Sequence, residues 1–228
     1  MNVKEADLCP DAPEKTGRRI AGQDPVKREQ ILDGANRVFT RLGFDAASMN
    51  DITREANVSK GTIYVYFANK EDLFEALIDR ERQSIFSDTA MAFAGDGSAG
   101  EKLKRYGTVL VRLICSEHVI MAQRTVIAIS SRMPEMAKRF YEKGPRKGKD
   151  TLIAYLNAEI AAGNLIIDDV ERAAYQFSEL CLAGIFRPRI FGYMPEPPTD
   201  EEIERSVSSA VGMFLSYYGS RRERAKET

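Results

Sequence analysis

Several side chains that can donate hydrogen bonds follow one another between residues 60 and 66. They are Lys60, Thr62, Tyr64 and Tyr66. Ile63 and Phe67 are four residues apart, so on a helix they share a face that can be buried, and the donors lie on the other faces. Such donors suit phosphate oxygens and the base edges of a DNA major groove. Gly61 costs about 1 kcal/mol relative to alanine inside a helix, which favours close approach of the backbone to another group, such as a phosphate.

A preceding helix and a tight turn must position these donors. Ser48 followed by Asp51 is a helix-start signature, because the hydroxyl and the carboxylate can each accept from a free backbone N–H. Asn57 tolerates the left-handed backbone conformation of a tight turn, and Ser59 can cap the helix that follows. The sequence therefore predicts a helix, a turn and a second helix between residues 48 and 67.

The same stretch resembles the helix-turn-helix signature of the TetR/AcrR family of transcriptional regulators. The run from Val58 to Phe74 contains Gly-Thr-aliphatic-Tyr, then Tyr-Phe, then an Asn-Lys helix cap, and the resemblance extends over roughly residues 26 to 80. It implies that one group of residues holds the DNA backbone, namely Ser48, Tyr66 and Lys70. It implies that a second group lies at or beside base edges, namely Lys60, Gly61, Thr62 and Tyr64. The alternative is that the two tyrosines pack between helices and the two lysines are only solvated.

Composition places the chain among globular proteins. It has 228 residues, of which 43% are hydrophobic and 29% are charged, and its formal net charge is -1. Between residues 15 and 70, however, ten basic residues stand against six acidic ones, which gives a regional charge of +4. The charge of the whole chain therefore does not indicate a nucleic-acid partner, whereas the charge of this region agrees with one.

The cysteines argue against two other classes of protein. Cys9, Cys115 and Cys181 are widely separated and form no Cys-x-x-Cys pair, so neither a disulfide framework nor a zinc site is expected. We expect no cofactor. Cys115 and Cys181 are expected to be buried core thiols, and the alternative that one of them senses oxidants stays open. The sequence has no apolar run typical of a secretory signal and none near the ~20 residues of a membrane span, which predicts a cytoplasmic protein without a membrane anchor.

A flexible tail is predicted for residues 1–23, which contain prolines and glycines and lack periodicity. Its basic residues after position 14 are Lys15, Arg18 and Arg19. They either follow DNA phosphates as an arm or are only solvated. Asp24 caps the next helix with Pro25 at its first position, and Gly43 ends it. Together with the helix-turn-helix, this helix makes a three-helix DNA-binding head over residues 24–70.

A larger helical domain is predicted for residues 71–219, followed by a charged tail over residues 220–228. Apolar residues recur at helical spacing and no segment alternates like a strand, so we expect an all-α protein of about nine helices. Gly144 with Pro145 predicts a break between two of these helices. The run from Met133 to Asp169 resembles the AefR-like C-terminal subgroup of the same family.

This resemblance implies an effector pocket among the helices of the larger domain. The candidate lining residues are Phe86, Leu110, Met121, Thr125, Tyr155 and Gln176. An apolar residue at helical spacing is also compatible with plain core, so that alternative stays open for each position. Glu179 could meet a cationic or hydroxylated ligand, or it could face solvent.

The two C-terminal helices carry apolar stripes with small residues that permit close packing between helices. These small residues are Ala174, Gly184, Ala210 and Gly212. They could pack inside one subunit, while the resemblance favours a homodimer interface.

An enzyme is the rival class. The single histidine, His118, has no nucleophile or metal-ligand pattern around it, and its place near a helix start is better explained by a surface or capping role. The sequence thus predicts a homodimeric transcriptional regulator without catalytic residues, which represses until a small, largely apolar ligand releases it from a partly palindromic operator. A regulator that activates, or one that has no effector, is the alternative.

Overall fold

The described part of the chain is helical throughout. The computed structural model describes residues 24–220, except for the side chains of residues 81–90. Eleven α-helices and one π-helical segment lie in these residues, together with one isolated β-bridge between Leu165 and Gly219. This confirms the predicted all-α class, with slightly more helices than expected. None of the helices between residues 24 and 220 combines the length and the apolar character that a membrane span requires. The predictions for residues 1–23 and 221–228, including the basic arm, lie outside the described residues.

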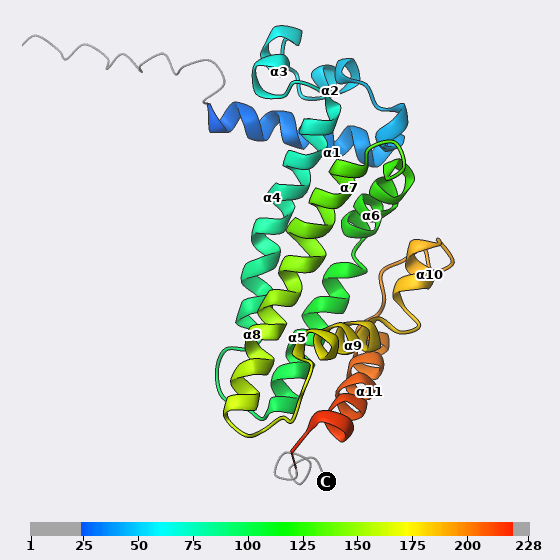
Figure 1. The fold of residues 1–228 in the computed structure, drawn as a ribbon. Coiled ribbons are helices and arrows are strands. Elements are labelled where there is room, and N and C mark those ends of the chain that lie inside the picture. Colours follow the sequence, from blue (N-terminus) through cyan, green and yellow to red (C-terminus); the bar gives the residue numbers. More distant parts are fainter. Residues whose placement is uncertain (1–23, 221–228) are drawn as a thin grey trace, which may run out of the picture.

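Three helices form the head at one end of the molecule (Figure 1). They are α1 (Pro25–Ala46), α2 (Met49–Glu55) and α3 (Lys60–Tyr66). Asp24 caps α1 by accepting from the Val26 N–H at 3.0 Å, and Pro25 occupies the first turn. The φ of Gly43 is 75°, so the regular path of α1 is interrupted where the sequence predicted its end.

Side-chain caps set the starts of α2 and α3. The Ser48 Oγ accepts from the Asp51 N–H at 3.2 Å, while the Asp51 Oδ2 accepts from the Ser48 N–H at 3.1 Å, which is the predicted capping box. Asn57 adopts a φ of 49° in the turn, and the Ser59 Oγ accepts from the Thr62 N–H at 3.0 Å. The predicted helix, turn and helix are therefore confirmed.

The remaining helices form an elongated body below the head. They are α4 (Lys70–Met91), α5 (Ala99–Ile114), α6 (Glu117–Ile129), α7 (Pro134–Tyr141), α8 (Lys147–Ala161), α9 (Val170–Leu182), α10 (Phe186–Ile190) and α11 (Asp200–Tyr218). Figure 1 shows α4 running away from the head beside α8, with α9 and α11 at the far end.

The helices predicted on either side of Gly144 and Pro145 form one continuous rod instead. α7 passes through a π-helical segment, η1 (Glu142–Arg146), directly into α8. Inside an α-helix, a proline lacks the N–H for the i→i−4 hydrogen bond and its ring collides with the preceding turn. The wider i→i+5 turn of a π-helix accommodates it. The predicted break is therefore wrong, because the irregular residues widen the helix without ending it.

Two hydrophobic cores lie along the molecule. The first surrounds Phe39, Phe44 and Phe74, whose ring centroids are 5.0 to 5.6 Å apart. It includes Val126 of α6 and Met136 of α7, so the head packs against the body beyond the predicted boundary at residue 70.

The second core joins α5, α9 and α11. Tyr106, Phe177 and Phe214 form its centre, with ring centroids of neighbouring pairs 6.3 and 5.1 Å apart. Ser220, which the sequence assigned to the C-terminal tail, is buried, and its N–H donates to the Asn164 carbonyl oxygen at 2.9 Å. The body therefore extends at least through Ser220.

Candidate nucleic-acid interface and ligand cavity

Helix α3 has one buried face and one exposed face. Ile63 and Phe67 are 0% and 5% exposed in the head core, whereas Tyr64 and Val65 are 47% and 51% exposed. Lys60 is also exposed. Figure 1 shows α3 at the outer end of the head, away from the body. This is the geometry of a helix that can enter a DNA groove, since its anchoring residues and its outward residues lie on opposite sides.

Thr62 and Tyr66 lie at the edges of this outward face, where both are half-buried. The Thr62 Oγ1 is 2.7 Å from the Ser59 Oγ at the helix start. Tyr66 packs against the head core. Packing between helices, the alternative left open for both tyrosines, therefore applies in part to Tyr66, while Tyr64 faces outward.

Gly61 has no neighbour that requires a glycine. A Cβ built at this helical position would meet only the Ser59 Oγ, 3.8 Å away. Gly34 on α1 differs, because a Cβ there would lie 2.6 Å from the Cβ of Ala56. Gly34 thus permits α1 and α2 to pack closely. The space beside Gly61, by contrast, is not used for packing within the chain, so it is open to a binding partner.

Lys70 is engaged inside the head. Its Nζ donates to the carbonyl oxygens of Phe44 (2.9 Å), Asp45 (3.1 Å) and Ala47 (3.2 Å), and it lies 4.6 Å from the centre of the Phe44 ring. An ammonium group has three N–H donors, so these contacts use all of them. This geometry does not support the expected phosphate contact, because the carbonyl oxygens near the end of α1 already hold the ammonium group.

The Ser48 hydroxyl is also used locally. It donates to the Asp51 Oδ2 at 2.5 Å, and this hydrogen bond is the main cause that lowers the pKa of Asp51 below its ordinary value. Arg54, whose side chain is 79% exposed, donates to the other oxygen of Asp51 at 2.7 Å. Sequence reasoning did not name Arg54, although its place as a basic residue just before the turn of the helix-turn-helix was the available signal.

Two arginines of α1 bind one carboxylate at the end of α2. Glu55 accepts from the Arg37 Nε at 2.8 Å and from two nitrogens of Arg41 at 3.2 Å. The hydrogen bonds from Arg37 and then Arg41 lower the pKa of Glu55. Both arginines are half exposed at their side chains, so this network ties α1 to α2 while it leaves positive charge at the surface.

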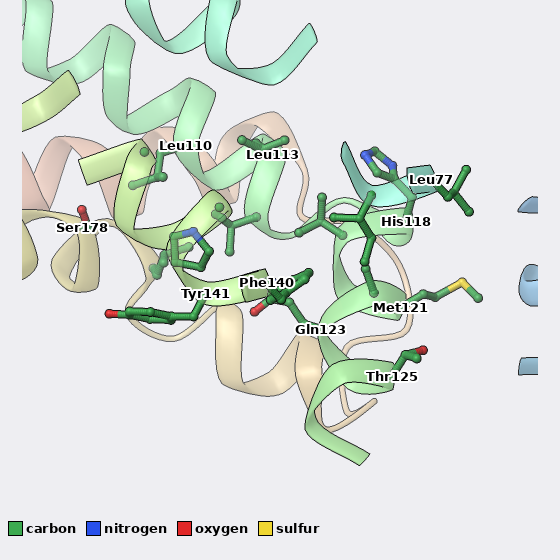
Figure 2. Close-up of a pocket in the computed structure, with 18 of the residues that line it drawn as sticks. Leu77, Leu110, Leu113, His118, Met121, Gln123, Thr125, Phe140, Tyr141 and Ser178 are labelled. Carbon is green, nitrogen blue, oxygen red and sulfur yellow. The ribbon is translucent and has the colours of Figure 1, made fainter. Parts of the chain in front are cut away.

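A cavity of about 310 Å³ lies where the head meets the body. Most of its wall is apolar and includes residues from α1, α4, α5, α6 and α7, such as Phe39, Leu77, Leu113, Ala122 and Phe140. Figure 2 shows Tyr141 and Ser178 at one end of the cavity, and His118, Met121 and Thr125 at the other. The volume falls at the lower end of the ~300–1,000 Å³ that small-molecule sites usually have.

Three of the six candidate ligand residues line this cavity, namely Leu110, Met121 and Thr125. Tyr155 does not, because its ring stacks on Phe93 at a centroid distance of 4.0 Å inside the second core. Gln176 is exposed elsewhere and accepts from the Tyr218 hydroxyl at 2.6 Å. The side chain of Phe86 lies outside the described residues. Helical periodicity marks the inward face of a helix, but it does not show whether neighbouring side chains fill the space there.

One end of the cavity is polar. Sequence reasoning named Glu179 there as a possible ligand contact but missed Tyr141, Lys149 and Tyr175. The Lys149 Nζ donates to the Tyr141 hydroxyl at 3.3 Å and lies 3.1 Å from the centre of the Tyr175 ring. The two hydroxyl oxygens are 3.1 Å apart. Ser178 and Glu179 lie in the same wall. The available signal was the irregular Gly-Pro pair between Tyr141 and Lys149, because π-helical segments occur frequently at functional sites.

The cavity touches the core of the head directly. Phe39 and Phe74 belong both to its wall and to the first core, where their rings meet edge to face at 5.5 Å. An ion pair between Arg132 and Asp45 (2.8 Å) crosses from the end of α6 to the end of α1. A change in the volume or shape of the cavity therefore acts on residues that also position α1 and α4.

The two described cysteines are core thiols. Burial raises the pKa of Cys115 to about 11 and that of Cys181 to about 12. Both are therefore thiols near neutral pH, which makes them poor nucleophiles. This agrees with the sequence interpretation.

Family models match both halves of the chain. The model for bacterial regulatory proteins of the tetR family matches residues 31–77, and the model for the C-terminal domain of AefR-like transcriptional repressors matches residues 101–220. YvkB, an HTH-type transcriptional regulator of Bacillus subtilis (strain 168), is 30% identical over 171 residues, which cover 72% of this chain and 79% of YvkB.

Solved structures agree with these matches over most of the chain. A TetR-family transcriptional regulator from Mesorhizobium loti MAFF303099 superimposes with a TM-score of 0.77 at 25% identity, covering 86% of this chain and 98% of that one. The flavonoid-responsive regulator FrrA superimposes with a TM-score of 0.71 at 29% identity, covering 87% of this chain and 100% of FrrA.

Proposed function

Because the chain belongs to the TetR family of bacterial regulatory proteins and carries an AefR-like repressor domain, we propose that it is a dimeric repressor that a small, largely apolar ligand releases from a palindromic operator. The DNA-binding part of this proposal rests on the orientation of α3. Its buried face anchors it in the head core, while Lys60 and Tyr64 face outward at the end of the molecule. A DNA-binding role is consistent with the cytoplasmic location that we also propose.

The outward residues of α3 divide into two roles. Lys60, Thr62 and Tyr64 read base edges, because they lie on or beside the exposed face of the helix. The open space at Gly61 allows the α3 backbone to approach the DNA closely. Tyr66 and the exposed Arg54 contact phosphates from the edge of this surface. We assign Ser48 and Lys70 to holding the head together, since their donors are already bound within it.

A dimer is required for specificity, because specific recognition usually buries on the order of 1,000 Å² of protein surface, more than one small head offers. Ala174 and Ala210 cannot serve this interface as the sequence suggested, since both are fully buried within their own subunit. The exposed face of α11 offers Gly212, Met213 and Tyr217 instead. Two heads related by a two-fold axis would read half-sites ~34 Å apart, or a multiple of this.

Ligand release follows from the position of the cavity. Phe39 of α1 and Phe74 of α4 line it and also pack in the head core, so a ligand that spreads these walls changes the angle at which α4 carries the head. The ligand shifts the equilibrium only by the difference in its affinity for the two states. A change from almost fully competent to almost fully incompetent for DNA requires about 5.5 kcal/mol of such difference.

The experiment that tests this function is selection of binding sites from random duplex DNA by the purified protein at two salt concentrations. We expect enrichment of a symmetric motif, and we expect Tyr64→Ala to abolish it. Failure to enrich any motif, with the protein folded and dimeric, would overturn sequence-specific DNA binding.

A pair of alanine substitutions separates DNA contact from folding. Gly61→Ala leaves or slightly raises the melting temperature, because alanine favours a helix and meets only the Ser59 Oγ at 3.8 Å. We expect it to weaken operator binding at least tenfold by blocking the approach of the backbone. Asn157→Ala on α8 is the matched control in the body, since Asn157 is an exposed helical residue outside the cavity wall, and it retains operator affinity. Equal operator affinities of the two variants would exclude a close approach of the α3 backbone to the DNA at Gly61.

A further inference from the structure

The polar end of the cavity contains a lysine held between two aromatic rings. The Lys149 Nζ is 3.1 Å from the centre of the Tyr175 ring and 5.5 Å from that of the Tyr141 ring. It also donates one hydrogen bond to the Tyr141 hydroxyl. Contacts with two rings stabilise the ammonium without neutralising its charge, because a ring carries no net charge. Lys149 is thus a fixed positive charge in a wall that is otherwise mainly apolar.

One phenolic proton of this cluster has no acceptor among the three residues of the cluster. Lys149, Tyr141 and Tyr175 are joined by two hydrogen bonds, one from the ammonium and one between the hydroxyls. Each phenol has one proton, and a single hydrogen bond joins the two hydroxyls, so only one of the two phenolic protons is used between them. The other can be donated to an acceptor. The Lys149 ammonium has further N–H donors beyond the one that Tyr141 accepts. The cluster therefore presents donors and positive charge, which suit an oxyanion.

The π-helical segment brings these residues together. In a regular α-helix, positions eight apart, such as Tyr141 and Lys149, differ by ~80° around the axis. The wider turn of η1, which lies between them, reduces the rotation per residue and returns both to the same side, where they touch. Gly148 adds no side chain here, and a Cβ on it would meet nothing within 4 Å. The irregular sequence that widens the helix thus also opens the polar end.

The electrostatics of the cluster agree with an anion at this position. The Lys149 ammonium, followed by the Tyr141 hydroxyl, holds the pKa of Tyr175 below its ordinary value. Glu179 is the opposing charge in the wall, one helical turn after Tyr175 on α9. It is exposed, whereas Lys149 is half-buried and held by the two tyrosines. A charge that is fixed and partly withdrawn from water discriminates between ligands better than a solvated one.

We propose that the cavity binds an apolar molecule that carries one acidic oxygen group, with the anion held by Lys149 and the hydroxyls of Tyr141 and Tyr175. The apolar part lies along Leu110, Leu113 and Phe140 towards Met121. This inference rests on the proposed ligand-responsive function and specifies the chemical class of its effector. Carboxylates, sulfonates and acidic phenols on a compact apolar body belong to this class.

The test compares two fluorescent probes that share an aromatic body. Anilinonaphthalene sulfonate is the anionic probe, and phenylnaphthylamine is the neutral one that lacks the sulfonate. Both are titrated into the full-length protein in the absence of DNA. Lys149→Met removes the charge while it keeps a long apolar side chain. Lys138→Met is the matched control, because Lys138 is an exposed residue of α7 outside the cavity wall.

We expect Lys149→Met to raise the Kd of the anionic probe about tenfold, which corresponds to about 1.4 kcal/mol, and to leave the Kd of the neutral probe unchanged. Lys138→Met changes neither value. Tyr175→Phe, which keeps the ring and removes the hydroxyl, gives a smaller loss for the anionic probe alone. Gly148→Leu fills the cavity from its polar end and weakens both probes.

Three outcomes would overturn the assignment. The first is an equal loss of both probes in Lys149→Met, which would mean that the lysine only shapes the cavity. The second is an unchanged Kd of the anionic probe in that variant. The third is unchanged binding in Gly148→Leu, which would place the probes outside the cavity. Loss of the DNA-binding function is detected separately by site selection, because the titrations contain no DNA.

Discussion

The outward face of α3 and the cavity below the head differ in how many elements build them. The α3 surface needs one seven-residue helix, anchored by Ile63 and capped by Ser59. The cavity draws its wall from helices between α1 and α9 that are far apart in the sequence. A surface made by one helix depends on local signals, whereas a cavity depends on where the side chains of many helices leave space between them. The outward face of α3 can therefore be predicted from a motif, whereas the cavity cannot.

The two regions also use a half-buried lysine differently. In the head, Lys70 is held by three backbone carbonyl oxygens, so its donors stabilise the fold. In the cavity, Lys149 is held by two aromatic rings and one hydroxyl, so donors remain for a ligand. Two lysines that look alike in the sequence thus differ in whether the protein itself uses up their hydrogen-bonding capacity.

The largest expected effect comes from a steric clash introduced where α1 packs closely on the end of α2. A Cβ at Gly34 would lie 2.6 Å from the Cβ of Ala56 and 2.8 Å from its backbone. Overpacking against backbone costs ~3 kcal/mol, which exceeds the ~1 kcal/mol gained from alanine in a helix. Gly34→Ala therefore lowers the free energy of unfolding in urea and abolishes operator binding.

Gly107→Ala provides the comparison in the body. A Cβ at Gly107 would approach side-chain atoms, Val207 Cγ1 at 2.8 Å and Cys181 Sγ at 3.0 Å, and side chains can shift more easily than backbone. We expect a cost of only ~1–2 kcal/mol with operator affinity retained. A larger loss in Gly107→Ala than in Gly34→Ala would contradict the view that the head depends on the tighter contact.

A smaller effect tests the assignment of Lys70. Hydrogen bonds that involve a charged group contribute ~1.5–3 kcal/mol, so Lys70→Met, which removes three such bonds in a partly buried site, lowers the stability of the head by ~2 kcal/mol. We expect Lys70→Met to leave the slope of log affinity against log salt concentration unchanged. Arg54→Met, by contrast, leaves stability nearly unchanged, because the Arg54 side chain is exposed, and makes that slope shallower by about one, since we assign Arg54 to a phosphate. A shallower slope with unchanged stability in Lys70→Met would restore Lys70 to the DNA interface, as the sequence predicted.

The smallest expected effect is the pH dependence of the contact between Glu55 and its two arginines. Because Arg37 and Arg41 lower the pKa of Glu55 from its reference value of 4.5, the carboxylate stabilises the folded head above that value. The contribution is lost as pH falls through the lowered pKa of the folded state. Glu55→Gln therefore lowers the melting temperature at neutral pH, and the difference from the unsubstituted protein narrows in acid. Glu204→Gln removes an ion pair with Lys104 in the body. Its change in melting temperature with pH is compared with that of Glu55→Gln in the head. A difference at Glu55 that is constant with pH would exclude this linkage.

Much of the head follows from short-range rules. Ser48 with Asp51, Asn57 and Ser59 each act within three residues of the backbone groups that they satisfy or the turn that they allow. Spacing of Ile63 and Phe67 also identifies the face of α3 that is buried. These features need no knowledge of distant contacts, which is why the helix-turn-helix could be predicted with its boundaries.

The sequence pattern was less informative where two interpretations share the same periodicity. Ala174 and Ala210 have the small side chains expected of an interface, yet both are buried inside the subunit. Tyr155 lies on an inward face like Leu110, but Phe93 stacks on it and fills the space. Periodicity reports the direction of a side chain from its own helix. Periodicity carries no information about which side chains of other helices lie opposite.

By itself, the sequence determined the all-α class, the helix-turn-helix and the outward donors Lys60 and Tyr64, because these depend on local capping and on the repeat of the helix. Only the tertiary structure decided that Lys70 is held by the chain, that Pro145 widens a helix without ending it, and that Tyr141, Lys149 and Tyr175 meet at one end of a cavity. Each of these results depends on contacts between residues that are distant in sequence or on the exact rotation of a helix. A linear pattern of residue types specifies neither.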